Sequence, residues 1–314
     1  MTVARAARLI RHGAPLRVED VELAGAGPDE VLVQLAFAGV NPVDRYGLLG
    51  RVAPDGPLPR TLGSEATGWL DGVPVLVHGA GLGSRRDGLW ATAAIVPRTS
   101  VIALPPGVEL DQAAAVGVAG ATAIRVVELA EVGPGARVVV LGATGGVGHM
   151  CCSLLRDRGA VVIAQSAHAD KRQFLERCGA HEIAIFDEHE AETALAALEP
   201  DAVLDPLGSS FSGAAIAALR PHGRLVLYGT SAGASGEVPL QLLYRKELRV
   251  LGYGGLIEPE ERLVEACEAA LEALAQGRLK IVIGERQPLG RVNEGLEHLA
   301  RRAVLGKLVL ELQA

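Results

Sequence analysis

Short apolar runs alternate with amphipathic segments between Ala136 and Tyr253. Each run is apolar at consecutive positions, as in a parallel strand that helices cover on both faces. The segments between the runs have helical spacing, for example Lys171–Cys178 and Phe211–Leu219. This pattern predicts an α/β fold with a doubly wound parallel sheet and right-handed crossovers. The predicted strands are Val138–Leu141, Ala160–Ala164, Ile183–Phe186, Ala202–Asp205, Leu225–Tyr228 and Leu248–Tyr253.

The first hundred residues have a different pattern. Strands are expected at Val31–Phe37, Val73–Val77 and Thr92–Val96, and turns rich in glycine and proline separate these runs. Few helical patterns intervene, so the segment predicts a β-rich domain. The apolar stretch Leu110–Leu129 that follows predicts one long helix or two.

A glycine-rich turn follows the first strand of the α/β region. The strand Arg137–Leu141 leads into a turn with glycines at 142, 145, 146 and 148, and a helix begins there. Glycines let the backbone approach a ligand closely, and a helix start offers free N–H groups and the positive end of its dipole to a phosphate. The turn therefore predicts a dinucleotide pyrophosphate site formed by Gly142, Thr144, Gly145, Gly146 and Val147.

The end of the chain is expected to return to the β-rich domain. Glu258–Gln276 predicts an amphipathic helix, and Lys280–Leu312 predicts a strand, a helix and a strand. We therefore expect a discontinuous substrate domain, residues 1–107 and 258–314. The nucleotide-binding domain is expected to span residues 108–257.

Composition and charge limit the classes of binding partner that we expect for this chain. The chain has 314 residues, a formal net charge of −7 and no basic stripe, which argues against a nucleic-acid partner. No apolar run reaches membrane-spanning length, and Met1–Ile10 lacks an apolar signal core, so no membrane association is expected. None of the four cysteines forms a C-x-x-C pair, which suggests buried free thiols in a reducing cytoplasm.

The second strand of the α/β region favours NADPH over NADH. Proteins that bind NAD usually place an acid at the end of this strand for the ribose 2′-hydroxyl. Here Ser166 ends the strand, and His168, Lys171 and Arg172 follow it. A hydroxyl and cations suit a 2′-phosphate. The alternative interpretation is a solvated helix start in which Lys171 and Arg172 bind nothing.

Several sequence blocks, in order along nearly the whole chain, resemble one superfamily. These blocks are Ala38-Gly39-Val40-Asn41-Pro42-Val43-Asp44, Leu62-Gly63-Ser64-Glu65-Ala66, Gly120-Ala121-Thr122-Ala123, the Gly142–Gly148 turn, Leu204-Asp205-Pro206-Leu207-Gly208, Pro221-His222-Gly223-Arg224-Leu225-Val226 and Gly306-Lys307-Leu308-Val309-Leu310. They resemble the medium-chain dehydrogenase/reductases, and among them the zinc-free quinone oxidoreductases related to zeta-crystallin. The resemblance implies a Rossmann domain joined to a chaperonin-10-like, β-rich substrate domain.

The resemblance also implies roles for individual residues. In such relatives the residues matching Asn41 and Thr122 contact the nicotinamide, and those matching Ser166 and Lys171 hold the 2′-phosphate. The strand ends that contain Tyr228, Gly229 and Gly254 line the cofactor groove. We take Tyr46, Asn41 and Ser64 as candidate catalytic residues, with Tyr46, Ser64 or water as the proton donor. Asp44 is expected to anchor a turn, and His78 is interpreted as structural.

This chain departs from the family pattern at positions that bear on metal binding and at positions that bear on the substrate pocket. Zinc-dependent relatives carry cysteine where Asn41 stands and histidine where Ser64 stands, so no metal is expected. The stretch Gly68–Val73 is shorter than in relatives, which suggests a lost hairpin loop. Val52 stands where relatives often carry a tyrosine at the substrate pocket, and its loss suggests a reshaped, more apolar pocket that is less suited to quinones. Phe186 stands where a tyrosine often flanks the adenine side of the cofactor.

These features favour an NADPH-dependent reductase of enones, enoyl thioesters or quinones, with a role in natural-product tailoring as one setting. Hydride transfer to such acceptors places the negative charge on an oxygen that hydrogen-bond donors can stabilise. A ketone or imine reductase, a redox-neutral enzyme and a non-catalytic NADPH-binding protein stay open as alternatives. The substrate is expected to be a small molecule. The apolar edge strand Leu248–Tyr253 suggests a homodimer.

Overall fold

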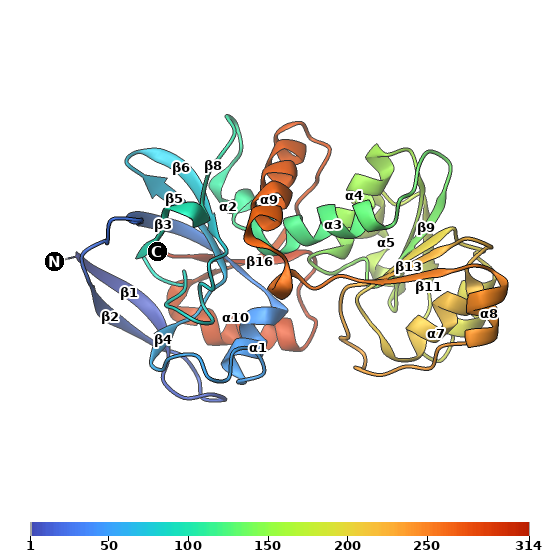
Figure 1. Ribbon diagram of the computed structural model, residues 1–314, viewed down its shortest axis with the longest axis horizontal. Coiled ribbons are helices and arrows are strands. Elements are labelled where there is room, and N and C mark those ends of the chain that lie inside the picture. Colours follow the sequence, from blue (N-terminus) through green and yellow to red (C-terminus); the bar gives the residue numbers. More distant parts are fainter. Residues whose placement is uncertain (1, 314) are drawn as a thin grey trace. The chain divides into compact units, whose positions relative to one another are not determined.

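The computed structural model describes residues 2–313 and divides into two compact units (Figure 1). Unit 1 extends to Ala121 and also contains Pro259–Gln276 and the segment that begins at Ile281. Unit 2 comprises Thr122–Glu258 and Gly277–Lys280. Unit 1 reaches Ala121, beyond the expected boundary at 107, because α2 packs on strands β3, β5 and β6 of unit 1.

Unit 2 contains a six-stranded parallel sheet with the strand order β11-β10-β9-β12-β13-β14. Its first and fourth strands along the chain lie side by side at the centre, as in a doubly wound nucleotide-binding fold. The six predicted strands are thereby confirmed, each within one or two residues at either end. The strands are β9 Arg137–Val140, β10 Val161–Ser166, β11 Glu182–Ile185, β12 Ala202–Asp205, β13 Arg224–Leu227 and β14 Arg249–Gly252.

Helices cover both faces of this sheet. On one face, Phe211 and Ile216 of α7 and Leu195 of α6 share a buried cluster with Val139 and Val203 of the central strands. On the other face α4 packs on β9 and β10. Burial on both faces explains why the strands are apolar at consecutive positions. The helices of this unit are α3 Ala121–Leu129, which starts at the unit boundary, α4 Gly148–Asp157, α5 Arg172–Arg177, α6 Ala191–Ala196, α7 Ser209–Ala218 and α8 Leu240–Arg245.

Unit 1 is built on two sheets. A three-stranded sheet has the order β2-β1-β4, and a seven-stranded sheet has the order β15-β16-β3-β5-β6-β8, with β7 also paired to β3. The C-terminal strand β16 pairs antiparallel with β3, so the tail rejoins the β-rich unit as predicted. The strands are β1 Thr2–Leu9, β2 Arg17–Leu23, β3 Glu30–Val40, β4 Arg60–Thr61, β5 Glu65–Leu70, β6 Val73–His78, β7 Ala93–Pro97, β8 Val101–Ala103, β15 Ile283–Pro288 and β16 Lys307–Glu311.

Helices complete unit 1. The short α1, Pro42–Leu48, follows β3 directly, and α9, Glu260–Ala275, is the predicted amphipathic helix. Helix α10, Val292–Ala300, packs on β15 and β16. The segment 110–129 is two helices: α2, Leu110–Ala113, and α3 are separated by a π-helical turn over Val116–Gly120.

The β5–β6 hairpin has the shortest possible connection. Leu70 pairs with Val73, so Asp71 and Gly72 form a two-residue turn, and both have positive φ, 50° and 81°. This is the conformation of a type I′ turn, for which Asp-Gly is a preferred sequence. The stretch Gly68–Val73 is therefore a hairpin with a minimal turn, and the loss of a loop relative to other family members stays a prediction.

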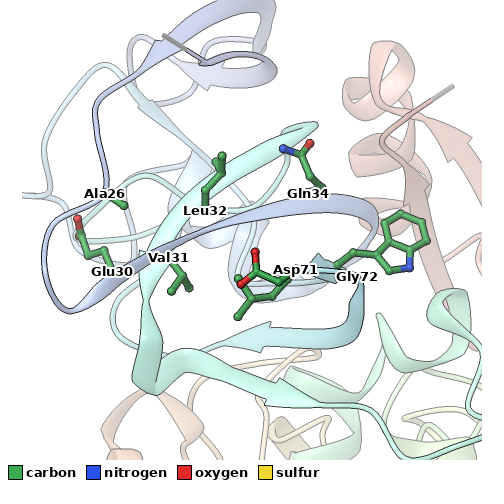
Figure 2. Close-up of a pocket in the computed structure, with 9 residues that line it drawn as sticks. Ala26, Glu30, Val31, Leu32, Gln34, Asp71 and Gly72 are labelled. Carbon is green, nitrogen blue, oxygen red and sulfur yellow. The ribbon is translucent and has the colours of Figure 1, made fainter.

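The side chain of Trp69, close to this turn, is exposed at 41% of its full area. Beside it is an open depression of about 510 Å³ in unit 1, where Leu32 and Gln34 of β3 lie close to Asp71 and Gly72 (Figure 2). None of the residues that line this depression belongs to the predicted site. The depression beside the hairpin turn is therefore distinct from the candidate chemistry.

The cysteines are buried and unpaired. Burial raises the pKa of Cys178 to about 11 and raises the pKa of the other three thiols further. These thiols therefore stay protonated near neutral pH and are poor nucleophiles. Within residues 2–313, no helix combines the length and the apolar character needed to span a membrane.

Candidate functional site

The turn between β9 and α4 forms a cradle for an anion. Gly142 has a φ of +56°, and its carbonyl accepts a hydrogen bond from Gly145 N at 3.0 Å. A Cβ added to Gly148 would lie 2.6 Å from the Gly142 carbonyl oxygen and 2.8 Å from Ala143 Cα, so only glycine fits there. The ten-residue helix α4 begins at Gly148, so the positive end of its dipole lies at this turn, and its His149 N–H donates to the Gly145 carbonyl at 3.3 Å. This geometry fits a pyrophosphate.

Gln165, at the end of β10, fixes the position of this cradle. Its side-chain oxygen accepts a hydrogen bond from Gly142 N at 2.9 Å, and its side-chain nitrogen donates to the Phe186 carbonyl at 2.7 Å. Its own carbonyl accepts from Ala143 N at 3.1 Å. Because Gln165 is buried, at 3% exposure, these bonds lock the turn to β10. The sequence analysis did not identify this residue, although a glutamine in an apolar strand was a signal.

The predicted phosphate corner follows β10. Ser166 is buried, and its hydroxyl accepts a hydrogen bond from His168 N at 3.2 Å. Lys171 pairs with the neighbouring Asp170 at 2.6 Å, whereas Arg172 is exposed. The structure therefore brings a hydroxyl and two cations to the end of β10, together with an acid that the sequence analysis did not consider. Asp170 competes with any anionic ligand for Lys171.

Other predicted cofactor residues lie at the same edge of the sheet. Tyr228 directly follows β13, and its backbone N donates to the Asp205 carbonyl at 2.9 Å. The Tyr228 hydroxyl is buried without a partner in the described part of the chain, and burial raises its pKa well above the usual value. Gly229 comes next, and Gly254 lies just beyond β14. Ligands of open α/β sheets bind at this carboxyl edge of the strands.

Unit 1 contains a buried polar network at the junction of β3, β5 and β16. Glu65 is fully buried, and its Oε1 accepts hydrogen bonds from Asn41 Nδ2 at 2.7 Å and from Lys307 Nζ at 3.1 Å. Lys307 Nζ also donates to Asn41 Oδ1 at 2.5 Å. The second Glu65 oxygen accepts from Val118 N at 2.8 Å. The Asn41 amide is thus held from both ends, at 3% exposure.

A second carboxyl group adjoins this network. Asp44 Oδ2 accepts from Asn41 N at 2.8 Å, and Oδ1 accepts from the Ser64 hydroxyl at 2.5 Å. Burial, opposed by these hydrogen bonds, raises the pKa of Asp44 to about 6. His78 Nδ1 lies 2.7 Å from the Ser64 carbonyl oxygen, which can only accept, so Nδ1 carries the proton. Burial lowers the pKa of His78, which keeps the ring neutral.

Comparisons with known proteins agree with this geometry. The protein of Schizosaccharomyces pombe named "Probable quinone oxidoreductase" is 30% identical over 309 residues, which cover 94% of this chain and 92% of that one. "Quinone oxidoreductase 1" of Escherichia coli is 28% identical over 320 residues, or 96% and 97% of the two chains. The chain belongs to the quinone oxidoreductase family of medium-chain dehydrogenase/reductases. The resemblance inferred from the sequence blocks is therefore confirmed.

Two further comparisons concern the dehydrogenase fold and the cofactor. The family model described as "Zinc-binding dehydrogenase" matches residues 146–274. A solved structure titled "NAD-dependent alcohol dehydrogenase" superposes with a TM-score of 0.86 and 27% identity, covering 98% of this chain and 99% of that one. This member of the quinone oxidoreductase family is an oxidoreductase that uses a nicotinamide cofactor, and its α/β architecture with a Rossmann domain is confirmed.

The donor set of this family member does not fit zinc. By the resemblance described above, Asn41 and Ser64 are expected to occupy the positions of a cysteine and a histidine in zinc-dependent relatives. The Asn41 amide is held by Glu65 and Lys307, and the Ser64 hydroxyl is held by Asp44. Within residues 2–313 no three His, Cys, Asp or Glu side chains are grouped as metal ligands. A catalytic zinc needs about three N, O or S ligands from the protein, so we derive no step through a metal.

The structure brings together part of the candidate catalytic set. Asn41 and Ser64 belong to the same hydrogen-bonded group, through Asp44 and Glu65. Tyr46 lies in α1 and is partly exposed, and its hydroxyl has no partner within residues 2–313. Thr122 is the second residue of α3, next to the π-helical turn. The roles of these residues toward a ligand stay predictions.

Proposed function

We propose that this chain is an NADPH-dependent, zinc-free reductase that transfers hydride to an activated carbon–carbon double bond, in an enone or enoyl thioester, or to a quinone. The observation that carries this proposal is the pair formed by Ser64 and Asp44. Where zinc-dependent relatives have a metal ligand, this chain has a hydroxyl donor held by a buried carboxyl group. A hydroxyl can stabilise an enolate oxygen but cannot replace a Lewis acid.

Unit 2 would hold the coenzyme through the cradle before α4, and when bound the reduced nicotinamide supplies the hydride. Unit 1 supplies hydrogen-bond donors, Ser64 and Tyr46, for the oxygen on which negative charge develops. Asn41 has little freedom to move, because Glu65 and Lys307 hold its amide. Reduction of a simple ketone would form an alkoxide and would require a stronger acid or a metal.

The acceptor class is tested by mixing the protein with NADPH and one acceptor at a time. The acceptors are an enone, an enoyl thioester, a naphthoquinone, a ketone and an imine. Oxidation of NADPH is followed by the loss of the absorbance of the reduced nicotinamide. We expect turnover with at least one of the first three classes. Turnover confined to the ketone or imine would contradict the proposed reaction. Tight NADPH binding with no turnover of any acceptor would identify a binding protein instead.

NADPH rather than NADH is supported by the corner formed by Ser166, Lys171 and Arg172. We expect the double variant Lys171→Ala/Arg172→Ala to lower the affinity for NADPH by about 10- to 100-fold. This loss corresponds to removal of a charge-assisted hydrogen bond of about 1.5–3 kcal/mol. The affinity for NADH, which lacks the phosphate, should change by less than about threefold, as measured by isothermal titration calorimetry.

The control for this prediction is Arg177→Ala, because Arg177 is another exposed cation on the same helix, α5. It should leave both affinities unchanged. Equal losses for NADPH and NADH in the double variant would contradict the assignment of the 2′-phosphate to this corner.

A homodimer is supported by the outer edge of the sheet in unit 2. Strand β14 has one paired side only, and Val250 is 44% exposed on it. Leu256 and Ile257, in the turn after this strand, are 67% and 88% exposed. Exposed apolar edges of this kind favour pairing with a second copy.

We expect Val250→Arg to convert a dimer to a monomer in sedimentation velocity at micromolar concentration, because a charge would be buried at the paired edge. Val73→Arg, which changes an exposed valine of unit 1 (50%), should leave the dimer intact. A wild-type monomer at this concentration would contradict the proposed dimer.

A cytoplasmic location is also proposed. It is supported by the four cysteines, which are unpaired and suit a reducing compartment. Fractionation of the producing cell, with the protein followed by antibody, would test it, and recovery from an oxidising compartment would contradict it.

A further inference from the structure

The hydrogen bond between Ser64 and Asp44 joins a partly exposed hydroxyl to a buried carboxyl group. The two oxygens are 2.5 Å apart, and Asp44 is 4% exposed. The backbone of Ser64 is fixed by the Nδ1–H of His78, which donates to the Ser64 carbonyl at 2.7 Å. A ligand can therefore reach this pair only from the Ser64 side.

The direction of this hydrogen bond depends on the charge of Asp44. An ionised carboxylate is an acceptor only, so the Ser64 hydroxyl must donate to it and has no hydrogen left for a ligand. A protonated carboxyl can donate its own O–H to Ser64 Oγ, while its other oxygen still accepts from Asn41 N at 2.8 Å. The hydrogen of Ser64 is then available to a second acceptor.

We propose that Asp44 is a positioning residue whose protonation turns the Ser64 hydroxyl toward the substrate, so that Ser64 is a proton donor only while Asp44 is protonated. This inference rests on the proposed reduction of an enone. Hydride from the reduced nicotinamide would add to the β-carbon with its electron pair. The C=C π electrons then form a double bond between the α-carbon and the carbonyl carbon, and the C=O π electrons move to the oxygen. That oxygen takes the Ser64 proton to give an enol, which tautomerises to the saturated ketone. Ser64 Oγ takes the Asp44 proton, and water later returns a proton to Asp44 through Ser64.

The groups around Asp44 set the pH at which this change occurs. The negative charge of Glu65 disfavours a second negative charge, whereas Lys307 and the hydrogen bonds from Ser64 and Asn41 favour ionisation. Burial outweighs these hydrogen bonds and the charge of Lys307, and the resulting pKa of Asp44 is about 6. His78, the other titratable group next to Ser64, stays neutral because burial lowers its pKa. The change therefore falls within a pH range in which the protein can be assayed.

Infrared difference spectroscopy of the protein alone tests the coupling of the two side chains. The C=O stretch of the protonated Asp44 carboxyl, assigned by its absence in Asp44→Asn, should titrate with a midpoint of about 6. Ser64→Ala should move the midpoint upward, because the ionised carboxylate loses a donor. Ser100→Ala changes a buried serine of unit 1 that bonds the Pro97 carbonyl, and it should leave the band unchanged. A midpoint near the ordinary value of about 4, or one that Ser64→Ala does not move, overturns the inference.

The pH profile of turnover tests the consequence for catalysis, with NADPH saturating and trans-3-nonen-2-one as the enone. The wild-type kcat should fall as pH rises through about 6. Asp44→Asn should remove this inflection and be slow at every pH, since the side-chain amide of this variant can hold Ser64 Oγ but cannot replace the proton that Ser64 gives up. Ser64→Ala should be about 100-fold slower below pH 6, with no inflection.

The two measurements separate this inference from the proposed function. An inflection that survives in Asp44→Asn overturns the inference while the reductase assignment stands. A wild-type kcat that does not change with pH around 6 would also overturn the inference and leave the reductase assignment in place. An infrared midpoint of about 6 that moves in Ser64→Ala, in a protein that reduces no acceptor, upholds the coupling of Asp44 to Ser64 and overturns the proposed reaction alone.

Discussion

Lys307→Met is expected to lower the free energy of unfolding of unit 1 by about 3–5 kcal/mol. Lys307 and Glu65 are 2% and 0% exposed, so the change leaves an unpaired negative charge in the core. Asn41 would also lose the donor that holds its Oδ1. Removal of one partner of a buried pair costs far more than the pair contributes when it is intact, because the remaining charge stays desolvated.

Urea unfolding followed by tryptophan fluorescence measures this loss in the correct unit. The only two tryptophans, Trp69 and Trp90, both lie in unit 1, and Trp90 is buried with its Nε1 donating to the Gly39 carbonyl. A Glu65→Gln/Lys307→Met double variant should recover at least about half of the loss, because it contains no buried charge at this position.

The matched control is Arg301→Met, which breaks an ion pair with Glu297 whose side chains are 77% and 68% exposed. An exposed pair of this kind contributes at most about 1 kcal/mol. A loss below about 1 kcal/mol for Lys307→Met would show that Glu65 is not held as a buried ion, and the account of the network would be wrong.

Much of the fold was predictable because its signals are local in sequence. The six strands of unit 2 are apolar at consecutive positions and the helices between them are not, so the periodicity changes at each boundary. The glycine turn and the residues after Ser166 were predictable for the same reason, since each lies within one short segment. The neighbouring Asp170 was also visible, but its ion pair with Lys171 depends on side-chain geometry.

The network of unit 1 was not predictable, because its members come from distant segments. Lys307 reaches Asn41 across 266 positions of sequence, through the antiparallel pairing of β16 with β3. Signals existed for its members: Glu65 stands in an apolar strand, and Lys307, one of only four lysines, begins another. Such residues are seldom buried unless they are paired. The partner of each becomes known only from the strand register.

The same reasoning applies to Asp44, which the sequence analysis assigned to anchoring a turn. It does anchor the turn, since it accepts from Asn41 N. Its second oxygen binds Ser64, and only the fold shows that the group is buried enough for its pKa to rise. Both candidate donors, Tyr46 and Ser64, were available from the sequence. The structure distinguishes the two donors. Only the Ser64 hydroxyl is hydrogen-bonded to a titratable group, the Asp44 carboxyl.

Gly148→Val is expected to lower the affinity for NADPH by at least about 100-fold. A Cβ at this position would lie 2.6 Å from the Gly142 carbonyl oxygen and 2.8 Å from Ala143 Cα. Both are backbone atoms, so no side-chain rotation can relieve the clash. The turn must therefore shift, which displaces the N–H groups that would bind the pyrophosphate. Loss of two charge-assisted hydrogen bonds, at about 1.5–3 kcal/mol each, accounts for a factor of this size.

Calorimetric titration with NADPH and with NADH distinguishes a defect at the pyrophosphate site from a defect at the 2′-phosphate site. NADPH and NADH share the pyrophosphate, so Gly148→Val should weaken both by the same factor, whereas Lys171→Ala/Arg172→Ala should weaken NADPH alone. Gly133→Val is the matched control, because Gly133 is exposed, has no atom within 4 Å of its added Cβ and does not require a positive φ. If Gly148→Val bound NADPH within about threefold of wild type, the cradle before α4 would not be the pyrophosphate site. The assignment of the coenzyme to unit 2 would then lose its main structural support.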